Sequence, residues 1–196
     1  MFASRFTALL DACVVAGALK RNVLLSLAAA DFFRPRWSAR ILSETEAAIA
    51  RMLADKGASD AQAVARRQIA AMEAAFADAR VEDYERLIPR FEGLPDANDA
   101  HVIAAAVSAQ ASVIVTDNLR DFPAQTIRSH GIEAKSADTF IADTLDLDMG
   151  RGVAALRAMR LRLKRPFHDA DDLLLKFEAH GLVESADLLR PWIDQL

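Results

Sequence analysis

The sequence predicts an α/β fold built on a mainly parallel sheet, followed by a C-terminal helical extension. Up to about residue 135, short apolar runs of strand length alternate with longer segments of helical spacing. From residue 136 onward the pattern is helical only. Alanine is the most frequent residue, which favours helices, and a hydrophobic content of 53% is enough for a packed core.

Local signals set the expected elements of the first part of the chain. In order, these are a strand at 6–10, a helix at 14–30, a connection at 34–36, helices at 38–56 and 59–76, a loop at 88–95, a helix at 98–109, and strands at 113–116 and 132–134. Pro35 indicates the connection because it restricts the residue before it to extended geometry. Ser38 caps the second helix, and Ser59 with Gln62 forms a capping box for the third.

The rest of the chain is expected to be helical. Its helices are predicted at 138–147, 152–164, 169–180 and 185–196. We therefore predict a domain at 1–128 and a mainly helical region at 129–196, whose start would supply a last strand to the sheet.

Composition excludes several classes of protein. One cysteine, Cys13, excludes a disulfide framework and a zinc site built on several thiolates. The longest apolar stretch, 23–30, is far too short to cross a bilayer, so a cytoplasmic protein without a membrane partner is expected. The net charge of −4 means that any nucleic-acid site must be a local basic patch.

Acidic residues follow two of the predicted strands directly. Asp11 and Asp117 therefore share the carboxyl edge of the sheet, where parallel α/β sheets bind their ligands. Asp99 opens the helix that precedes the second of these strands, and a helix N-terminus favours an ionised carboxylate. Carboxylates held together repel unless a cation lies between them, and hard oxygen ligands select Mg²⁺ or Mn²⁺.

Four segments carry a resemblance to a known family. They read LLDACVV, PRWSARILSETE, LPDANDAHVIAAAVSAQASVIVTDNLRDFP and HGIEAKSADTFIAD, and together they cover most of residues 6–143. In this order they resemble a PIN-domain endoribonuclease of the kind found as the toxin of VapBC toxin–antitoxin pairs. The resemblance implies a three-layer α/β/α fold, and the tail resembles the extra helical region of a subset of these toxins.

The resemblance also implies site residues. Asp11, Glu44 and Asp99 match the first three acidic positions of the family, and the fourth is either Asp117 or Asp121. Asp11, Asp99 and Asp117 are the expected metal ligands. Asn118 and Thr116 are expected to support them. One position departs from the family, because Cys13 stands where asparagine is usual, and this puts the orientation of Asp11 in doubt.

Each of these positions also has a structural interpretation. Asp99 could be a helix cap, although Asp96 could take that task instead. The pair Asp117-Asn118 could be an ordinary turn, and Asp121 could cap the segment after Pro123. By helical spacing alone Glu46 competes with Glu44. The four histidines, at 101, 130, 168 and 180, are interpreted as structural.

A basic segment stands out in the tail. Residues 151–165 contain arginine and lysine but no acidic residue. Arg157, Arg160 and Lys164 recur at i, i+3 and i+7, which places them on one helix face. We predict that this face binds RNA phosphates, the alternative being a solvated helix face.

These observations favour a metal-dependent endoribonuclease, with water activated by Mg²⁺ or Mn²⁺ as the attacking group. The resemblance implies an RNA substrate, a cognate antitoxin and the capacity to form a homodimer. A catalytically weakened RNA- or partner-binding protein of the same fold is the alternative. A receiver-like signalling domain is more remote, since Thr116 and Lys135 fit it but no second acidic residue follows Asp11.

Overall fold

Five parallel strands form the centre of the molecule. The computed structural model describes residues 6–91, 94–163 and 169–196. The strand order is β3-β2-β1-β4-β5. The strands are β1 (Thr7–Leu10), β2 (Arg34–Ser38), β3 (Arg80–Val81), β4 (Val113–Val115) and β5 (Glu133–Lys135). Every pairing in the sheet is parallel, so all strands end at the same edge.

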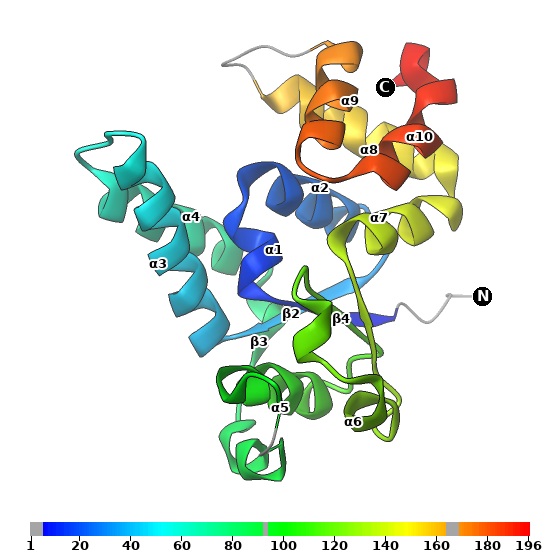
Figure 1. Ribbon diagram of the computed structural model, residues 1–196. Helices are drawn as coiled ribbons and strands as arrows, with labels where there is room; N and C mark the ends of the chain where they lie inside the picture. Colours follow the sequence, from blue (N-terminus) through cyan, green and yellow to red (C-terminus); the bar gives the residue numbers. More distant parts are fainter. Residues whose placement is uncertain (1–5, 92–93, 164–168) are drawn as a thin grey trace.

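Helices cover both faces of this sheet (Figure 1). One face carries α1 (Ala12–Ala16), α2 (Ala18–Ala29) and α7 (Ala137–Asp146), and the other carries α5 (Ala100–Ser108) and α6 (Ala124–Arg128). A hairpin of α3 (Ala39–Asp55) and α4 (Ala61–Ala75) packs beside α1. This arrangement confirms the α/β/α fold with a parallel sheet.

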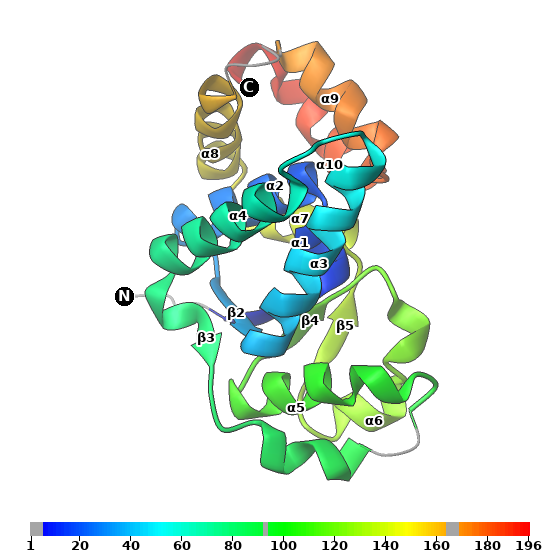
Figure 2. The same ribbon diagram turned by 90° about the vertical axis from the view of Figure 1, so that its left-hand side faces the viewer.

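The C-terminal residues add a further helical layer outside the first face. It consists of α8 (Met149–Arg162), α9 (Ala170–Ala179), α10 (Val183–Leu189) and a 3-10 segment, η5 (Arg190–Gln195). In Figure 2 this layer lies above α2 and α7, at the end of the molecule opposite α5. Helix α8 contacts α2 and α7, and α10 contacts α7. The helical extension is therefore confirmed, whereas the domain boundary at residue 128 stays a prediction.

The connection predicted at 34–36 is wrong, because these residues belong to β2. Ala8 of β1 stands opposite Pro35, and the main-chain N–H of Arg34 donates to the carbonyl of Phe6 at 3.0 Å. Neighbouring residues of a strand direct their N–H groups to opposite sides. The N–H of Arg34 points toward β1, so the N–H that Pro35 lacks would have pointed toward β3. Strand β3 pairs only with Trp37 and Ser38, beyond the proline.

Other differences concern short segments. The helix predicted at 14–30 is divided at Gly17 into α1 and α2. The capping box before α4 does not form, because Gln62 donates instead to Glu46 of α3. Among the described residues, four more segments are 3-10 helix. They are η1 (Ala77–Ala79), η2 (Glu85–Phe91) in part of the predicted loop at 88–95, η3 (Ala97–Asp99) at the start of the helix predicted at 98–109, and η4 (Leu119–Asp121).

Buried apolar side chains hold the layers together. Leu9 and Leu10 of β1 and Ile114 of β4 are fully buried between the helices on the two faces. Phe33 and Phe140 pack edge to face, with ring centroids 4.9 Å apart, which joins the β2 end of the sheet to α7. Within the described ranges, no helix combines the length and apolar character needed to cross a membrane.

Candidate active site

Asp11 lies where β1 ends and α1 begins. Its Oδ1 accepts from the main-chain N–H of Ala12 at 2.6 Å, and its own N–H donates to the carbonyl of Val115 at 3.0 Å. The strand therefore places the carboxylate at the carboxyl edge of the sheet, and the first turn of α1 holds it there. The residue is only 6% exposed.

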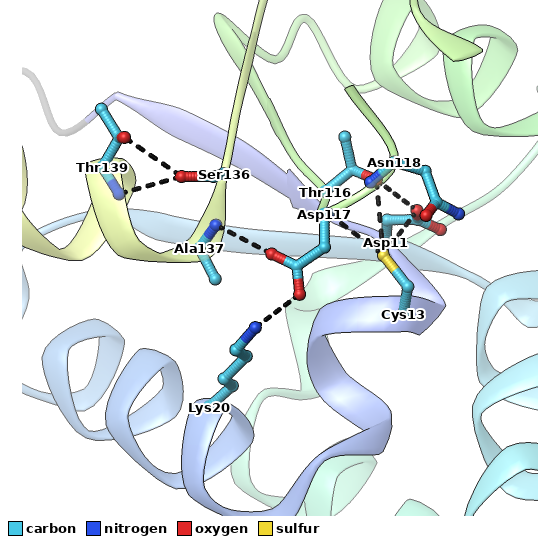
Figure 3. Close-up of polar contacts among 9 residues, drawn as sticks. All are labelled: Asp11, Cys13, Lys20, Thr116, Asp117, Asn118, Ser136, Ala137 and Thr139. Carbon is cyan, nitrogen blue, oxygen red and sulfur yellow. Dashed lines mark hydrogen bonds and ion pairs between the residues drawn. The ribbon is translucent and has the colours of Figure 1, made fainter. Parts of the chain in front are cut away.

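Two side chains from neighbouring segments orient this carboxylate (Figure 3). Oδ2 of Asp11 accepts from the hydroxyl of Thr116 at 2.8 Å and from the thiol of Cys13 at 3.2 Å. Burial, followed by the nearby charge of Asp11, raises the pKa of the Cys13 thiol to about 12. The thiol therefore stays protonated near neutral pH and remains a hydrogen-bond donor. It supplies an orienting contact at the position where the replacement of asparagine by cysteine had put the support of Asp11 in doubt.

Asp99 lies at the junction of η3 and α5. Its pKa is raised to about 6, first by burial and then by the charges of Asp11, Asp96, Asp121 and Glu44. Asp96 caps η3 by accepting from the N–H of Asn98 at 2.8 Å, and the Asp99 side chain makes no capping hydrogen bond. Three separate segments of the chain, together with the cap of the turn that Asp99 itself ends, thus bring negative charge to Asp99.

The two candidates for the fourth acidic position differ in their surroundings. Oδ2 of Asp117 lies 2.6 Å from Nζ of Lys20, and its Oδ1 accepts from the N–H of Ala137 at 3.4 Å (Figure 3). Asp117 is not among the charges that raise the pKa of Asp99, whereas Asp121 is. The Asp121 side chain is 15% exposed. Asp121 therefore lies near enough for its charge to act on Asp99, whereas Asp117 is engaged in an ion pair with Lys20.

Thr116 and Asn118 have separate places in this arrangement. The main-chain N–H of Asn118 donates to the hydroxyl of Thr116 at 3.1 Å. That hydroxyl in turn donates to Asp11. Thr116 is fully buried, so the loop after β4 is tied to the end of β1.

Glu44 projects from α3 and has two partners. Its Oε1 lies 3.0 Å from Nε of Arg40, one turn earlier, and 3.2 Å from Nε2 of His101 on α5. Burial, followed by the charge of Arg40, lowers the pKa of His101 to about 4. Sequence reasoning interpreted His101 as structural and missed this contact. A lone imidazole in the otherwise apolar segment AHVIAAAV was the signal that could have found it.

The donor set has the chemistry of a divalent cation site, although its atoms are not yet at ligand spacing. Asp11, Glu44, Asp99 and Asp121 offer hard carboxylate oxygens, which Mg²⁺ and Mn²⁺ prefer. In the part of the chain that the structure describes, no three acidic, histidine or cysteine side chains are close enough to hold one ion. Because the carboxylates repel one another, a cation between them would draw them closer.

The residues expected to bind RNA lie on the outer helical layer. Arg157 of α8 is exposed, and Nε of Arg160 donates to the carbonyl oxygen of Leu196 at 3.1 Å. Lys164 lies outside the described residues. Helix α8 packs on α2 and α7 rather than beside the acidic residues. The structure therefore does not bring this basic face to the candidate active site.

A separate groove of about 1260 Å³ lies between α2 and α4. Arg21, Arg34, Arg36 and Arg162 line part of it. None of the four clustered carboxylates lines this groove, so we place the candidate active site at the acidic cluster and not at this concavity.

Comparisons with known proteins agree with the observed fold and its C-terminal extension. A model of the PIN domain family matches residues 7–120, and a model of the VapC50 C-terminal domain matches residues 137–191. A protein of Mycobacterium tuberculosis (strain ATCC 25618 / H37Rv) named "Putative ribonuclease VapC50" is 49% identical over 49 residues. That stretch is 25% of this chain and 29% of the relative, so the match spans less than a third of the curated protein. No solved structure matches the chain.

Proposed function

Because the chain belongs to the PIN domain family, we propose that it is a metal-dependent endoribonuclease. The observation that carries the proposal is the cluster of four carboxylates at the carboxyl edge of the sheet. Asp11 follows β1, Glu44 projects from α3, Asp99 precedes α5 and Asp121 ends η4. Their charges act together on the pKa of Asp99, as expected of groups that share one small region.

These four residues are the proposed ligands of Mg²⁺ or Mn²⁺. When bound, such an ion lowers the pKa of a water molecule and offsets charge on the phosphoryl and leaving oxygens. Asp121 takes the fourth place in this proposal because Asp117 is paired with Lys20. The family resemblance left these two residues as alternatives.

The chain's own residues prepare this site. Ala12 and Thr116 fix both oxygens of Asp11 by hydrogen bonds, so the carboxylate keeps one orientation. The Cys13 thiol adds a third donor. No serine or cysteine is required as nucleophile, and the raised pKa of Cys13 makes its thiol a poor one.

We further propose that the protein is the toxin of a toxin–antitoxin pair. The match of residues 137–191 to the VapC50 C-terminal domain supports this role, together with the printed name of the mycobacterial relative. Its partners would then be an RNA substrate and a cognate antitoxin protein. A short reading frame for a DNA-binding antitoxin next to the coding sequence would support the proposal independently.

A cleavage assay tests the proposed activity. Purified protein is incubated with a mixture of cellular RNAs in Mg²⁺, in Mn²⁺ and in EDTA. We expect discrete cleavage products with either ion and none in EDTA. Asp11→Asn should reduce cleavage to background, because it removes a charged ligand while its amide oxygen still accepts from Ala12.

Asp55→Asn is the matched control, since it makes the same charge change at an exposed position at the end of α3. It should cleave as the parent does. A folded parent that binds RNA without cleaving it under any metal condition would favour the alternative of a binding protein. Cleavage that persists undiminished in Asp11→Asn would contradict the proposed site.

A further inference from the structure

His101 joins helix α5 to helix α3, which carries Glu44 of the acidic cluster. It stands in the first turn of α5 and reaches Glu44 of α3, with 3.2 Å between its Nε2 and Oε1 of the carboxylate. The imidazole is 1% exposed, whereas the Glu44 side chain is 40% exposed. A rigid, buried ring therefore holds a side chain that would otherwise move in solvent.

The other ring nitrogen of His101 is left unpaired by the described part of the chain. Nδ1 of His101 is buried and makes no hydrogen bond with any described residue. A carboxylate only accepts hydrogen bonds, so the proton of the neutral ring lies on Nε2 and the bare lone pair lies on Nδ1. Burying an unpaired polar atom costs stability, and an apolar side chain at position 101 would avoid that cost. Fold stability alone therefore does not account for histidine here.

The contact also selects one oxygen of Glu44. Arg40 and His101 both donate to Oε1, so neither occupies Oε2. The Arg40 side chain is 44% exposed and also donates to the carbonyl of Asn98 at 3.5 Å. Exposed ion pairs of this kind within one helix hold a carboxylate weakly. The buried imidazole is the more rigid of the two donors.

We propose that His101 is a positioning residue: its Nε2–H fixes Oε1 of Glu44 so that Oε2 is free to bind the divalent cation. The inference rests on the proposed function, because it depends on Glu44 being a metal ligand. Partners that orient a metal ligand through hydrogen bonds typically account for 10- to 100-fold in metal affinity or activity. His101 acts through Glu44 and does not itself contact the cation.

Three substitutions separate positioning from simple packing. His101→Leu removes both nitrogens and fills the space with apolar atoms. His101→Gln restores an amide donor near the Nε2 position, and His101→Asn restores one only near the Nδ1 position, too short to reach Glu44. The measurements are Mn²⁺ affinity by titration calorimetry and thermal unfolding of the metal-free protein in EDTA.

We expect His101→Leu to weaken Mn²⁺ binding about 10-fold or more, while its melting temperature in EDTA stays equal to the parent's or rises. His101→Gln should recover most of the affinity, and His101→Asn should not. Thr45→Val is the control for disturbance of α3, since Thr45 is buried next to Glu44 in the chain and its hydroxyl donates to the carbonyl of Ile41. It should bind Mn²⁺ as the parent does.

The outcomes distinguish the two proposals. If the parent binds no Mn²⁺, or if Glu44→Gln binds it as well as the parent does, the proposed metal site fails and this inference fails with it. If Glu44→Gln weakens binding but His101→Leu does not, only the inference is overturned. Should His101→Leu fail to fold, equal affinities for His101→Gln and His101→Asn would overturn it.

Discussion

At the scale of single residues, the candidate site depends on how each carboxylate is surrounded. Asp11 is satisfied by three donors in a buried position, so its orientation is fixed before any ligand arrives. Asp99 makes no capping bond and faces the charges of four other acids. Two aspartates of one site therefore differ in role: one is held in place and the other carries uncompensated repulsion.

This repulsion predicts a pH dependence for the metal-free protein. The pKa of Asp99 is raised from 3.8 to about 6 in the folded chain, so folding favours its protonated form. Protonated Asp99 therefore contributes to the free energy of unfolding. This contribution is complete below about pH 4 and is lost as the pH rises through about 6. Because Asp99 is partly exposed, we expect a loss of only about 1 kcal/mol from this group.

Urea unfolding in EDTA between pH 4 and pH 7 measures the effect. Asp99→Asn should remove this loss and be more stable than the parent at pH 7. Equal stability differences between the two proteins across the whole range would show that Asp99 is solvated and uncoupled. Mn²⁺ should stabilise the parent more at pH 7 than at pH 5, since the ion competes with the proton.

At the scale of elements, the side chain of Asp138 helps to join the C-terminal layer to the helices on the sheet. Asp138 of α7 accepts from the N–H groups of Glu184 and Ser185 at 2.9 Å and from the Ser185 hydroxyl at 2.7 Å. It therefore caps the start of α10 from another helix. Ser185 is fully buried, so its donors have no access to water once the carboxylate is removed.

We expect Asp138→Ala to lower the free energy of unfolding by about 2 kcal/mol, because hydrogen bonds to a charged group are lost and buried donors are left unpaired. Chemical denaturation gives the magnitude, and amide exchange should show the largest loss of protection in α10. Asp143→Ala on the same helix is the control, since its ion pair with Lys135 is exposed and should contribute under 1 kcal/mol. Similar losses in both variants would contradict the capping role.

At the scale of the whole molecule, the basic segment of α8 lies on the outer layer and the acids lie at the sheet edge. Two arginines of the basic segment make contacts within the protein. Arg160 donates to the carbonyl of Leu196, and Arg151 stacks on the ring of Phe32 at 4.2 Å. Arg157 remains exposed on this surface. RNA that reaches both regions must extend beyond the acidic cluster.

The salt dependence of RNA binding tests whether bound RNA reaches Arg157. If Arg157 neutralises one phosphate, Arg157→Ala should reduce the slope of log K against log salt by about 0.7 for single-stranded RNA, without moving the cleavage position. RNA binding is measured at several salt concentrations, with Asp11→Asn present in both proteins so that the RNA is not cleaved. An unchanged slope would identify the face as solvated and leave the C-terminal layer to contact the antitoxin or a second copy of the chain.

Much of the fold was determined by short-range patterns. The apolar run before Asp11, the β-branched run at 113–116 and the capping residue Ser38 all form the predicted structures, because each signal acts within a few residues. The shared edge of a parallel sheet then follows from the order of strands and helices. In this way the sequence alone was enough to place Asp11 at the carboxyl edge and Asp99 at a helix start.

Only the tertiary structure decided the contacts between distant segments. Pro35 is tolerated in an inner strand because β3 is short and pairs only with residues after the proline. The residues around position 35 give no sign of this pairing. The difference between Asp117 and Asp121 depends on Lys20, which is 97 residues from Asp117 along the chain. The contact of His101 with Glu44 likewise depends on how α5 packs near α3. Local sequence encodes which groups are available, whereas the packing of helices against the sheet determines which of them meet.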